Sequence, residues 1–317
     1  MTGERGRDGY DPFARGPCPV GVRTIQARDA GRDRSFSCEI WYPAPARHGG
    51  QDVPGPCPLI IYSHPSGAHR RAATFLCTHL SSHGYVVAAL DHREDETAEQ
   101  KIASRVPDVR FLLDRLIDGP AWDPDAHLDP ARIGIVGHSF GGWTALAAPD
   151  VESRIRAVVA LAPAGASRRK PGILPATLTF AWGRDVPTLY LVAEDDVYLP
   201  LAGMYELYDR TPATRRMVIL RRADHYHFMD DGEELHEAAR VTPFTGELAW
   251  IPQDMRPIAE LCSGEEARVF VRGLTLGHLD AMLRGREEAQ RFWAGDLEAE
   301  LAGRGVDALC VGRVPRG

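Results

Sequence analysis

A serine flanked by glycines stands in the stretch Gly137-His138-Ser139-Phe140-Gly141. This GxSxG pattern directly follows the apolar residues 133–136 and precedes a run that suits a helix. A serine hydroxyl is a weak nucleophile unless a base takes its proton and a tight turn projects its oxygen from the backbone. Flanking glycines let a strand and a helix approach closely enough to form that turn. The pattern therefore predicts a nucleophile at Ser139, rather than a serine that merely caps a helix.

A nucleophile of this kind needs a histidine base that is held by a carboxylate, in the chain order serine, acid, histidine. Four histidines follow the serine, namely His225, His227, His236 and His278. The first two come just after the last expected core strand, where a loop reaches the serine turn. His236 sits in a charged, helix-like run and is expected to be solvated, and His278 is expected at the surface or in packing. Periodicity leaves the choice between His225 and His227 open.

The carboxylate is expected directly after the strand predicted at residues 188–192, where the candidates are Glu194, Asp195 and Asp196. The residues after Asp196 lead into a helix, which is the usual setting of a triad acid. This context favours Asp196 over Asp195. The remaining acids are expected in turns or caps.

Backbone N–H groups must stabilise the negative charge that develops on the attacked carbonyl oxygen. The N–H of Phe140 opens the following helix and points toward that charge. A second donor is expected in the loop His64-Pro65-Ser66-Gly67, which follows an apolar strand. Proline has no N–H, so Ser66 is favoured and Gly67 is the alternative. The alternative is that this segment forms only a turn with no role in catalysis.

Other polar and aromatic side chains near these motifs could bind a metal, form a loop or line a pocket. His225, His227, Asp230, Asp231 and His236 have no common metal-ligand spacing, so neither a metal nor a cofactor is expected. The charged residues 91–96 are expected to form a solvated loop at a strand end. Aromatic side chains most often belong to the core, but apolar pockets are also lined by them. The candidate pocket-lining residues are His64, Trp143, Phe180 and Trp182.

The chain has a regular alternation of elements that would position these residues. Strands are expected at residues 20–27, 36–42, 59–62, 85–90, 133–136, 155–161, 188–192 and 217–220, and helices at 72–83, 106–117, 141–148 and across 261–301. Alternating strands and helices predict an α/β fold with a mostly parallel central sheet, helices on both faces and a small or absent cap. One domain is expected over residues 18–302, with tails at 1–17 and 303–317 and a long surface loop at 43–58.

The 317 residues are 44% hydrophobic and 26% charged, as in soluble globular proteins. A net charge of −7 disfavours nucleic acid and anionic membranes as partners, because both select for basic surfaces. The sequence contains neither an apolar run of roughly 18 residues nor a signal peptide, so no membrane span is expected and the location is expected to be cytoplasmic. Six cysteines without a CxxC pair are expected to be reduced thiols.

The sequence resembles the α/β-hydrolase superfamily, and more narrowly its platelet-activating-factor acetylhydrolase, dienelactone-hydrolase and polyester-hydrolase branches. Residues 59–70, 82–93 and 137–142 carry the closer likeness, which covers roughly 20–229. The resemblance implies the α/β-hydrolase fold, with Ser139 as nucleophile and His225 as base. It also implies that Phe140 and Ser66 are the oxyanion donors.

Three features depart from these branches. The acetylhydrolases place their acid after the strand that here ends in Ala160-Leu161-Ala162-Pro163, where no carboxylate stands, so the acid is expected at Asp196 as in the wider superfamily. The usual His-Gly after the third strand is His64-Pro65, and the cysteine nucleophile of dienelactone hydrolases is replaced by Ser139. The expected function is a serine hydrolase that cleaves small-molecule carboxylic esters through an acyl-enzyme. An acyltransferase or thioesterase on the same triad, or a silent binding protein, is the alternative, and the sequence indicates neither the substrate nor the oligomeric state.

Overall fold

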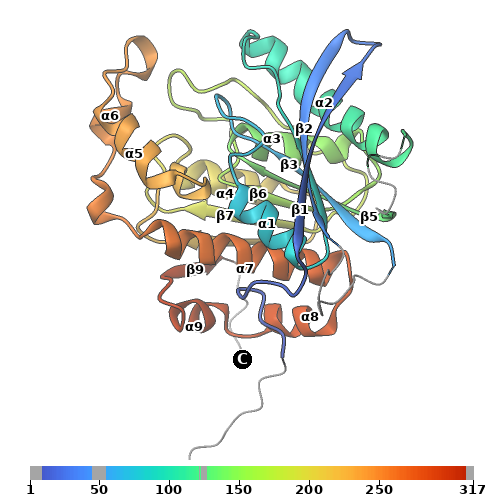
Figure 1. Ribbon diagram of the computed structural model, residues 1–317. Coiled ribbons are helices and arrows are strands. Elements are labelled where there is room, and N and C mark those ends of the chain that lie inside the picture. The colour runs from blue at the N-terminus through green and yellow to red at the C-terminus, as the bar shows by residue number, and fades with distance from the viewer. Residues whose placement is uncertain (1–8, 45–54, 121, 123–126, 312–317) are drawn as a thin grey trace, which may run out of the picture.

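The computed structural model describes residues 9–44, 55–120, 122 and 127–311. Nine strands in these residues form one sheet in the order β1-β2-β4-β3-β5-β6-β7-β8-β9 (Figure 1). They are β1 (Val20–Asp29), β2 (Arg34–Pro43), β3 (Cys57–Ser63), β4 (Val86–Leu90), β5 (Leu128–His138), β6 (Ile155–Leu161), β7 (Thr188–Ala193), β8 (Arg215–Leu220) and β9 (Ala308–Val311). The six strands from β4 to β8 in this order pair in parallel, whereas the pairs β1–β2, β2–β4 and β8–β9 toward the two edges are antiparallel.

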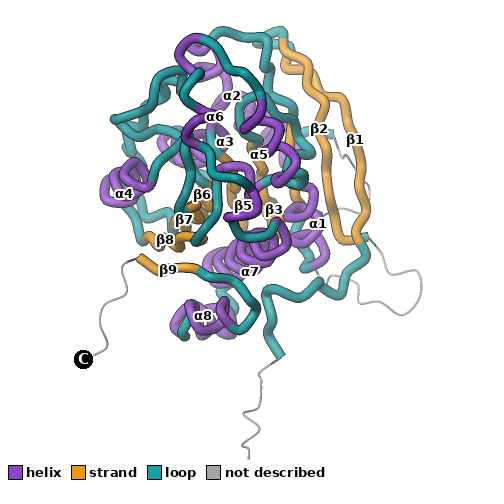
Figure 2. Tube along the Cα trace, turned by 90° about the vertical axis from the view of Figure 1, so that its left-hand side faces the viewer, coloured by secondary structure: helices purple, strands orange, loops and turns teal. Residues whose placement is uncertain are grey.

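The described helices cover both faces of this sheet (Figure 2). They are α1 (Thr74–Ser82), α2 (Ala98–Ile117), α3 (Phe140–Ala147), α4 (Leu201–Arg210), α5 (Gly232–Val241), α6 (Ile251–Asp254), α7 (Gly264–Met282), α8 (Glu287–Ala294) and α9 (Leu297–Ala302). Buried side chains of α2, α3 and α4 pack into one core cluster, and those of α1, α7, α8 and α9 into a second on the other face. Strands β3, β4 and β7 are buried along their whole length, because helices cover them on both sides. The prediction of a mostly parallel sheet with helices on both faces is confirmed.

Helix α2 begins at Ala98, eight residues before the start expected from the sequence. Its first turns are polar, so they lack the apolar period that marks a buried helix face. A capping box starts the helix instead, in which the Thr97 hydroxyl accepts from the Gln100 N–H and the Gln100 side chain accepts from the Thr97 N–H. The unexpected turns carry Arg105, which is fully buried beside the candidate active site.

Both predicted tails contain structured residues. Phe13 is buried against Gly273 of α7, where a Cβ would lie 2.1 Å from its ring, and the Tyr10 hydroxyl donates to Asp280 at 3.1 Å. At the other end β9 pairs with β8, although residues 303–317 were expected to be a tail. The expectation of unstructured tails was therefore wrong at these residues. A few aromatic side chains that pack singly, and an edge strand of only four residues, produce no periodic sequence pattern. Residues 1–8, 45–54 and 312–317 of the expected tails and loop lie outside the described part.

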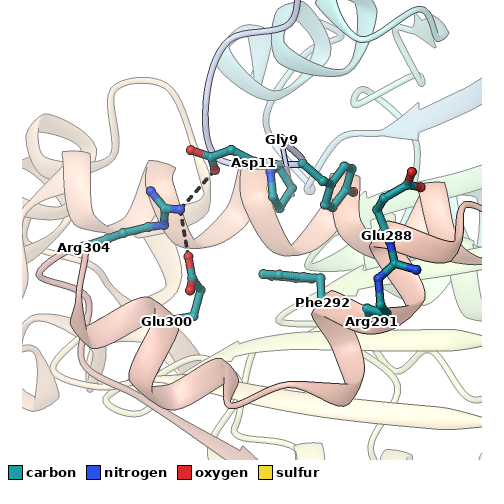
Figure 3. A pocket seen from close by; sticks show the side chains of 9 residues that line it. Gly9, Asp11, Glu288, Arg291, Phe292, Glu300 and Arg304 are labelled. Atoms are coloured by element: carbon teal, nitrogen blue, oxygen red, sulfur yellow. Dashed lines mark hydrogen bonds and ion pairs between the residues drawn. The ribbon is translucent and has the colours of Figure 1, made fainter. Parts of the chain in front are cut away.

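A cavity of about 470 Å³ lies between this N-terminal segment and helices α8 and α9 (Figure 3). Arg304 donates there to Asp11 at 3.1 Å and to Glu300 at 2.8 Å. These ion pairs connect the N-terminal segment to α9.

Among the described residues, no helix is both long and apolar enough to cross a membrane.

Candidate active site

Ser139 lies in the tight turn between β5 and α3, with φ 57° and ψ −116°. A positive φ is rare for a residue with a side chain, and such strain persists only where the surroundings enforce it. A Cβ on Gly137 would lie 2.0 Å from the Gly141 carbonyl oxygen. A Cβ on Gly141 would lie 1.9 Å from the carbonyl oxygen of Ser63, at the end of β3. The two glycines therefore allow the strand, the helix and the loop after β3 to meet at the serine.

Replacing Gly141 with alanine is expected to destabilise the protein by roughly 3 kcal/mol or more, because the new methyl group meets backbone atoms that cannot rotate away. Relief of the clash should also move the turn that carries Ser139. Thermal unfolding of the variant measures the effect. Gly303→Ala is the matched control, because its Cβ would meet nothing closer than 3.4 Å. Equal melting temperatures for the two variants would contradict this description of the turn.

A short hydrogen bond joins two of the residues singled out in the sequence. Nδ1 of His225 donates to Oδ2 of Asp196 at 2.7 Å, and both side chains are buried. The other oxygen of Asp196 accepts from the backbone N–H groups of Tyr198 at 2.9 Å and Leu199 at 2.8 Å. The His225 ring lies 4.7 Å from the ring of His138, the residue directly before Ser139. The acid, the histidine and the serine turn therefore lie near one another at the carboxyl ends of the parallel strands.

Burial alone would lower the pKa of His225, but the charge of Asp196 and its hydrogen bond outweigh burial and raise that pKa. Burial also lowers the pKa of His138, and because no carboxylate hydrogen bond offsets it there, that pKa stays far below its ordinary value. A neutral His138 ring beside His225 adds no like charge to the site. The electrostatics thus concentrate positive charge, when it forms, on His225.

The alternative residues have different partners. Asp195 is paired with Arg256 at 3.3 Å, and Glu194 accepts from the Arg222 N–H at 3.0 Å. His227 accepts from the Asp224 N–H at 3.1 Å through Nδ1 and donates to the Cys262 carbonyl at 2.9 Å through Nε2. Its two ring nitrogens are thus engaged in fixing the turn that carries His225.

His236 is fully buried, which corrects the expectation of a solvated side chain. Its Nε2 donates to the Arg256 carbonyl at 2.8 Å, and its Nδ1 lies 3.0 Å from Oδ1 of Asp224. Burial opposes the charged form of His236, but Asp224 raises its pKa, and the neighbouring imidazoles lower the pKa of the Asp224 carboxyl. This buried ion pair anchors the turn of His225, and only the tertiary fold brings its members together.

Asp230, one of the residues whose spacing fits no common metal site, caps a helix. Its carboxylate accepts from the N–H groups of Thr74 at 2.7 Å and Phe75 at 3.0 Å, at the start of α1. These hydrogen bonds connect the segment after His225 to α1, which lies far from it in the sequence. In the part of the chain that the structure describes, no group of three His, Cys, Asp or Glu side chains is arranged to hold a metal ion.

The two expected oxyanion donors occupy different settings. Phe140 is the first residue of α3, so its N–H opens that helix. Ser66 is exposed, and its hydroxyl donates to Glu94 at 3.3 Å. The N–H of Gly67, the alternative donor, is engaged with the same carboxylate at 3.0 Å. The assignment of the second donor to Ser66 stays a prediction.

Three of the candidate pocket residues are engaged in packing. His64 is fully buried and accepts from the His92 N–H at 3.0 Å, and the indole of Trp182 donates to the Leu146 carbonyl at 3.1 Å. Phe180 packs edge-on against Trp182 at 5.7 Å inside the core. Trp143 stacks on Phe140 at 5.1 Å, beside the serine turn.

The charged segment 91–96 is mostly not a solvated loop. His92 is buried, Asp91 pairs with Arg70 and Glu96 with Arg34, while Glu94 holds Lys101 and the buried Arg105. A run of charges usually marks a solvated face, and the sequence does not reveal that cations from distant elements converge on this one. Glu94 and Arg105 are the residues near the site that sequence reasoning missed.

Known proteins share the sequence pattern of this chain. A family model described as PET hydrolase-like matches residues 14–271. Platelet-activating factor acetylhydrolase from Cavia porcellus is 24% identical over 224 residues, which are 55% of this chain and 48% of that protein. The match therefore spans about half the length of that relative. Bis(hydroxyethyl) terephthalate hydrolase from Streptomyces coelicolor is 23% identical over 240 residues, 72% of this chain and 70% of that protein.

A solved structure shares the fold as well. Ferulic acid esterase from Streptomyces cinnamoneus superposes with a TM-score of 0.64 at 23% identity, over 85% of this chain and 91% of that chain. At this identity the likeness concerns the arrangement of the sheet and its helices.

Proposed function

The chain belongs to the PET hydrolase-like family, and on that premise we propose that it is a serine hydrolase that cleaves carboxylic esters through an acyl-enzyme intermediate. The α/β-hydrolase fold predicted from the sequence is confirmed by the shared fold of the esterase structure. The observation that carries the proposal is the 2.7 Å hydrogen bond between Asp196 and His225 beside a serine in a strained turn.

In the proposed reaction Nε2 of His225 takes the proton of Ser139 while the serine oxygen attacks the ester carbonyl carbon. Asp196 holds the ring in the tautomer whose Nδ1–H points at the carboxylate, and it stabilises the imidazolium that forms. The N–H groups of Phe140 and Ser66 stabilise the oxyanion.

Collapse of the tetrahedral intermediate breaks the bond to the alcohol, which receives the proton from His225. A water molecule then loses a proton to the same base and attacks the acyl carbon. Ser139 regains its proton as the carboxylic acid leaves. The cycle uses only side chains and backbone groups of this chain together with ester and water.

The activity should rise with pH, because His225 accepts a proton only when it is neutral. Since Asp196 raises the pKa of His225, kcat/KM should fall as the pH drops through an apparent pKa above the ordinary value of about 6.5. Asp196→Asn removes the charge that favours the imidazolium, so it should move this midpoint to lower pH. A pH profile of kcat/KM for both proteins measures the shift, with Asp195→Asn as the control that leaves the midpoint in place. A midpoint that does not move in Asp196→Asn would contradict the assignment.

Turnover of p-nitrophenyl esters from acetate to palmitate tests the proposed function. Release of p-nitrophenol is expected, and its dependence on chain length sizes the acyl pocket. Product analysis with an added alcohol separates hydrolysis from acyl transfer, because an acyltransferase would form a new ester. A folded protein that turns over none of these esters contradicts the proposal.

A further inference from the structure

The side chain of Arg105 lies between the two segments that supply the expected oxyanion donors. It comes from α2, is fully buried, and donates through Nη1 to the His64 carbonyl at 2.6 Å. Its guanidinium carbon lies 4.7 Å from the centroid of the Phe140 ring. One planar group therefore contacts the loop after β3 on one side and the first residue of α3 on the other.

Glu94 connects the same guanidinium to the other end of that loop. Its Oε1 accepts from Nη2 of Arg105 at 2.7 Å. Its Oε2 accepts from the Gly67 N–H at 3.0 Å and from the Ser66 hydroxyl at 3.3 Å, and Lys101 completes its shell at 2.9 Å. A single carboxylate thus holds both residues that were candidates for the second donor.

The rest of the loop is fixed from behind by a buried chain of hydrogen bonds. The His92 N–H donates to Nε2 of His64 at 3.0 Å, and Nδ1 of His64 donates to the Pro65 carbonyl at 2.7 Å. The ring of His92 donates in turn to Asp108 at 3.1 Å. Arg105 and Glu94 therefore act on a loop whose base is already rigid, and they set where its tip lies relative to α3.

We propose that Arg105 and Glu94 are positioning residues that set the spacing between the two oxyanion N–H groups, those of Phe140 and Ser66. The inference rests on the proposed function, because it assigns a role within the same site. Donors must lie within about 2.7–3.1 Å of the developing oxyanion, so two donors on separate segments need a rigid connection. Guanidinium is planar and donates at fixed angles while it stacks on an aromatic ring, which an ammonium group cannot reproduce.

Charge and burial fit this role. Burial lowers the pKa of Arg105 to about 10, so the group stays protonated at neutral pH and keeps all its donors. Glu94 supplies the matching negative charge. Removing the charge of Glu94 leaves the buried guanidinium of Arg105 without its carboxylate partner. Removing Arg105 takes away the hydrogen bond that holds the His64 carbonyl, while Glu94 keeps its ion pair with Lys101. Either change should therefore move the tip of the loop.

Three substitutions test the inference: Arg105→Lys, Arg105→Met and Glu94→Gln. Arg284→Lys is the matched control, because Arg284 also donates to a backbone carbonyl, that of His83 at 2.8 Å, and also lies over a ring, that of Tyr85 at 3.9 Å. Arg284 lies just after α7, outside the site. Thermal unfolding shows which variants are folded, and Glu94→Gln keeps the shape of a partly exposed side chain if a change at Arg105 prevents folding.

The readouts are kcat and KM for a p-nitrophenyl ester, and the inhibition constants of an alkyl boronic acid and of the product carboxylic acid. The boronic acid forms a tetrahedral adduct that needs both oxyanion donors, whereas the carboxylic acid reports binding of the ground state. We expect kcat to fall roughly 10- to 100-fold in Arg105→Met and in Glu94→Gln, with KM little changed. Boronic acid affinity should fall by the same factor while carboxylic acid affinity holds. Arg105→Lys should keep part of the activity, and Arg284→Lys all of it.

Folded variants with the kcat of the wild type, or with losses confined to KM, would overturn the inference while leaving the proposed function intact. Equal weakening of the boronic acid and the carboxylic acid would overturn it as well, since that pattern reports a damaged pocket. A wild-type protein that hydrolyses no ester would instead refute the proposed function itself.

Discussion

Replacing Ser139 with alanine should lower kcat for ester hydrolysis by on the order of 10³-fold or more. The substitution removes the oxygen that attacks the carbonyl, and no other hydroxyl can take its place in the strained turn with φ 57°. Fold and substrate binding should survive, because alanine tolerates this backbone no worse than serine and the glycines on both sides remain. Steady-state kinetics with a p-nitrophenyl ester measure the loss.

Ser81→Ala is the control for this substitution. Ser81 is fully buried on α1, so its loss tests the general effect of deleting a buried hydroxyl. The control should keep wild-type kcat, whereas Ser139→Ala should keep the melting temperature and lose the reaction. A folded Ser139→Ala protein with unchanged turnover would rule out the covalent mechanism.

Replacing Asp196 with asparagine should lower kcat roughly 10³- to 10⁴-fold. Asparagine has nearly the same shape and can still accept from the Tyr198 and Leu199 N–H groups. It carries no charge to stabilise an imidazolium, and its amide can donate to Nδ1 of His225, which favours the wrong tautomer. Kinetics at a pH well above the midpoint of the wild type isolate this effect from the shift in pKa.

Asp195→Asn separates the two neighbouring acids. Asp195 pairs with Arg256 at 3.3 Å near the surface, where an ion pair is worth little. That variant should retain most of the activity of the wild type. The reverse result, a crippled Asp195→Asn and an active Asp196→Asn, would transfer the role of the acid to Asp195.

Residues at the ends of core strands were accessible to sequence reasoning. Buried parallel strands are short apolar runs, and their carboxyl ends lie at one edge of the sheet. This regularity placed Ser139, Asp196 and the pair His225 and His227 near one another, and the resemblance to the α/β-hydrolases favoured His225 within that pair. The 2.7 Å contact between Asp196 and His225 agrees with this placement. Their catalytic roles remain predictions.

Groups that depend on tertiary contacts were not accessible in this way. Arg105 lies in polar turns of α2 that have no apolar period, and Glu94 lies in a charge run that looks solvated. The burial of His236 depends on Asp224, which is twelve positions away in the chain. Buried ion pairs leave no local pattern, because each partner is polar and the contact that permits its burial comes from another element.

Labelling with a fluorophosphonate probe, followed by peptide mapping by mass spectrometry, shows whether Ser139 is an activated nucleophile. The probe phosphonylates a serine only where a base and an oxyanion site activate it. We expect one adduct per chain on the peptide that contains Ser139, formed rapidly in the wild type and slowly in Asp196→Asn. An adduct on another residue, or no adduct on a protein that hydrolyses esters, would contradict it.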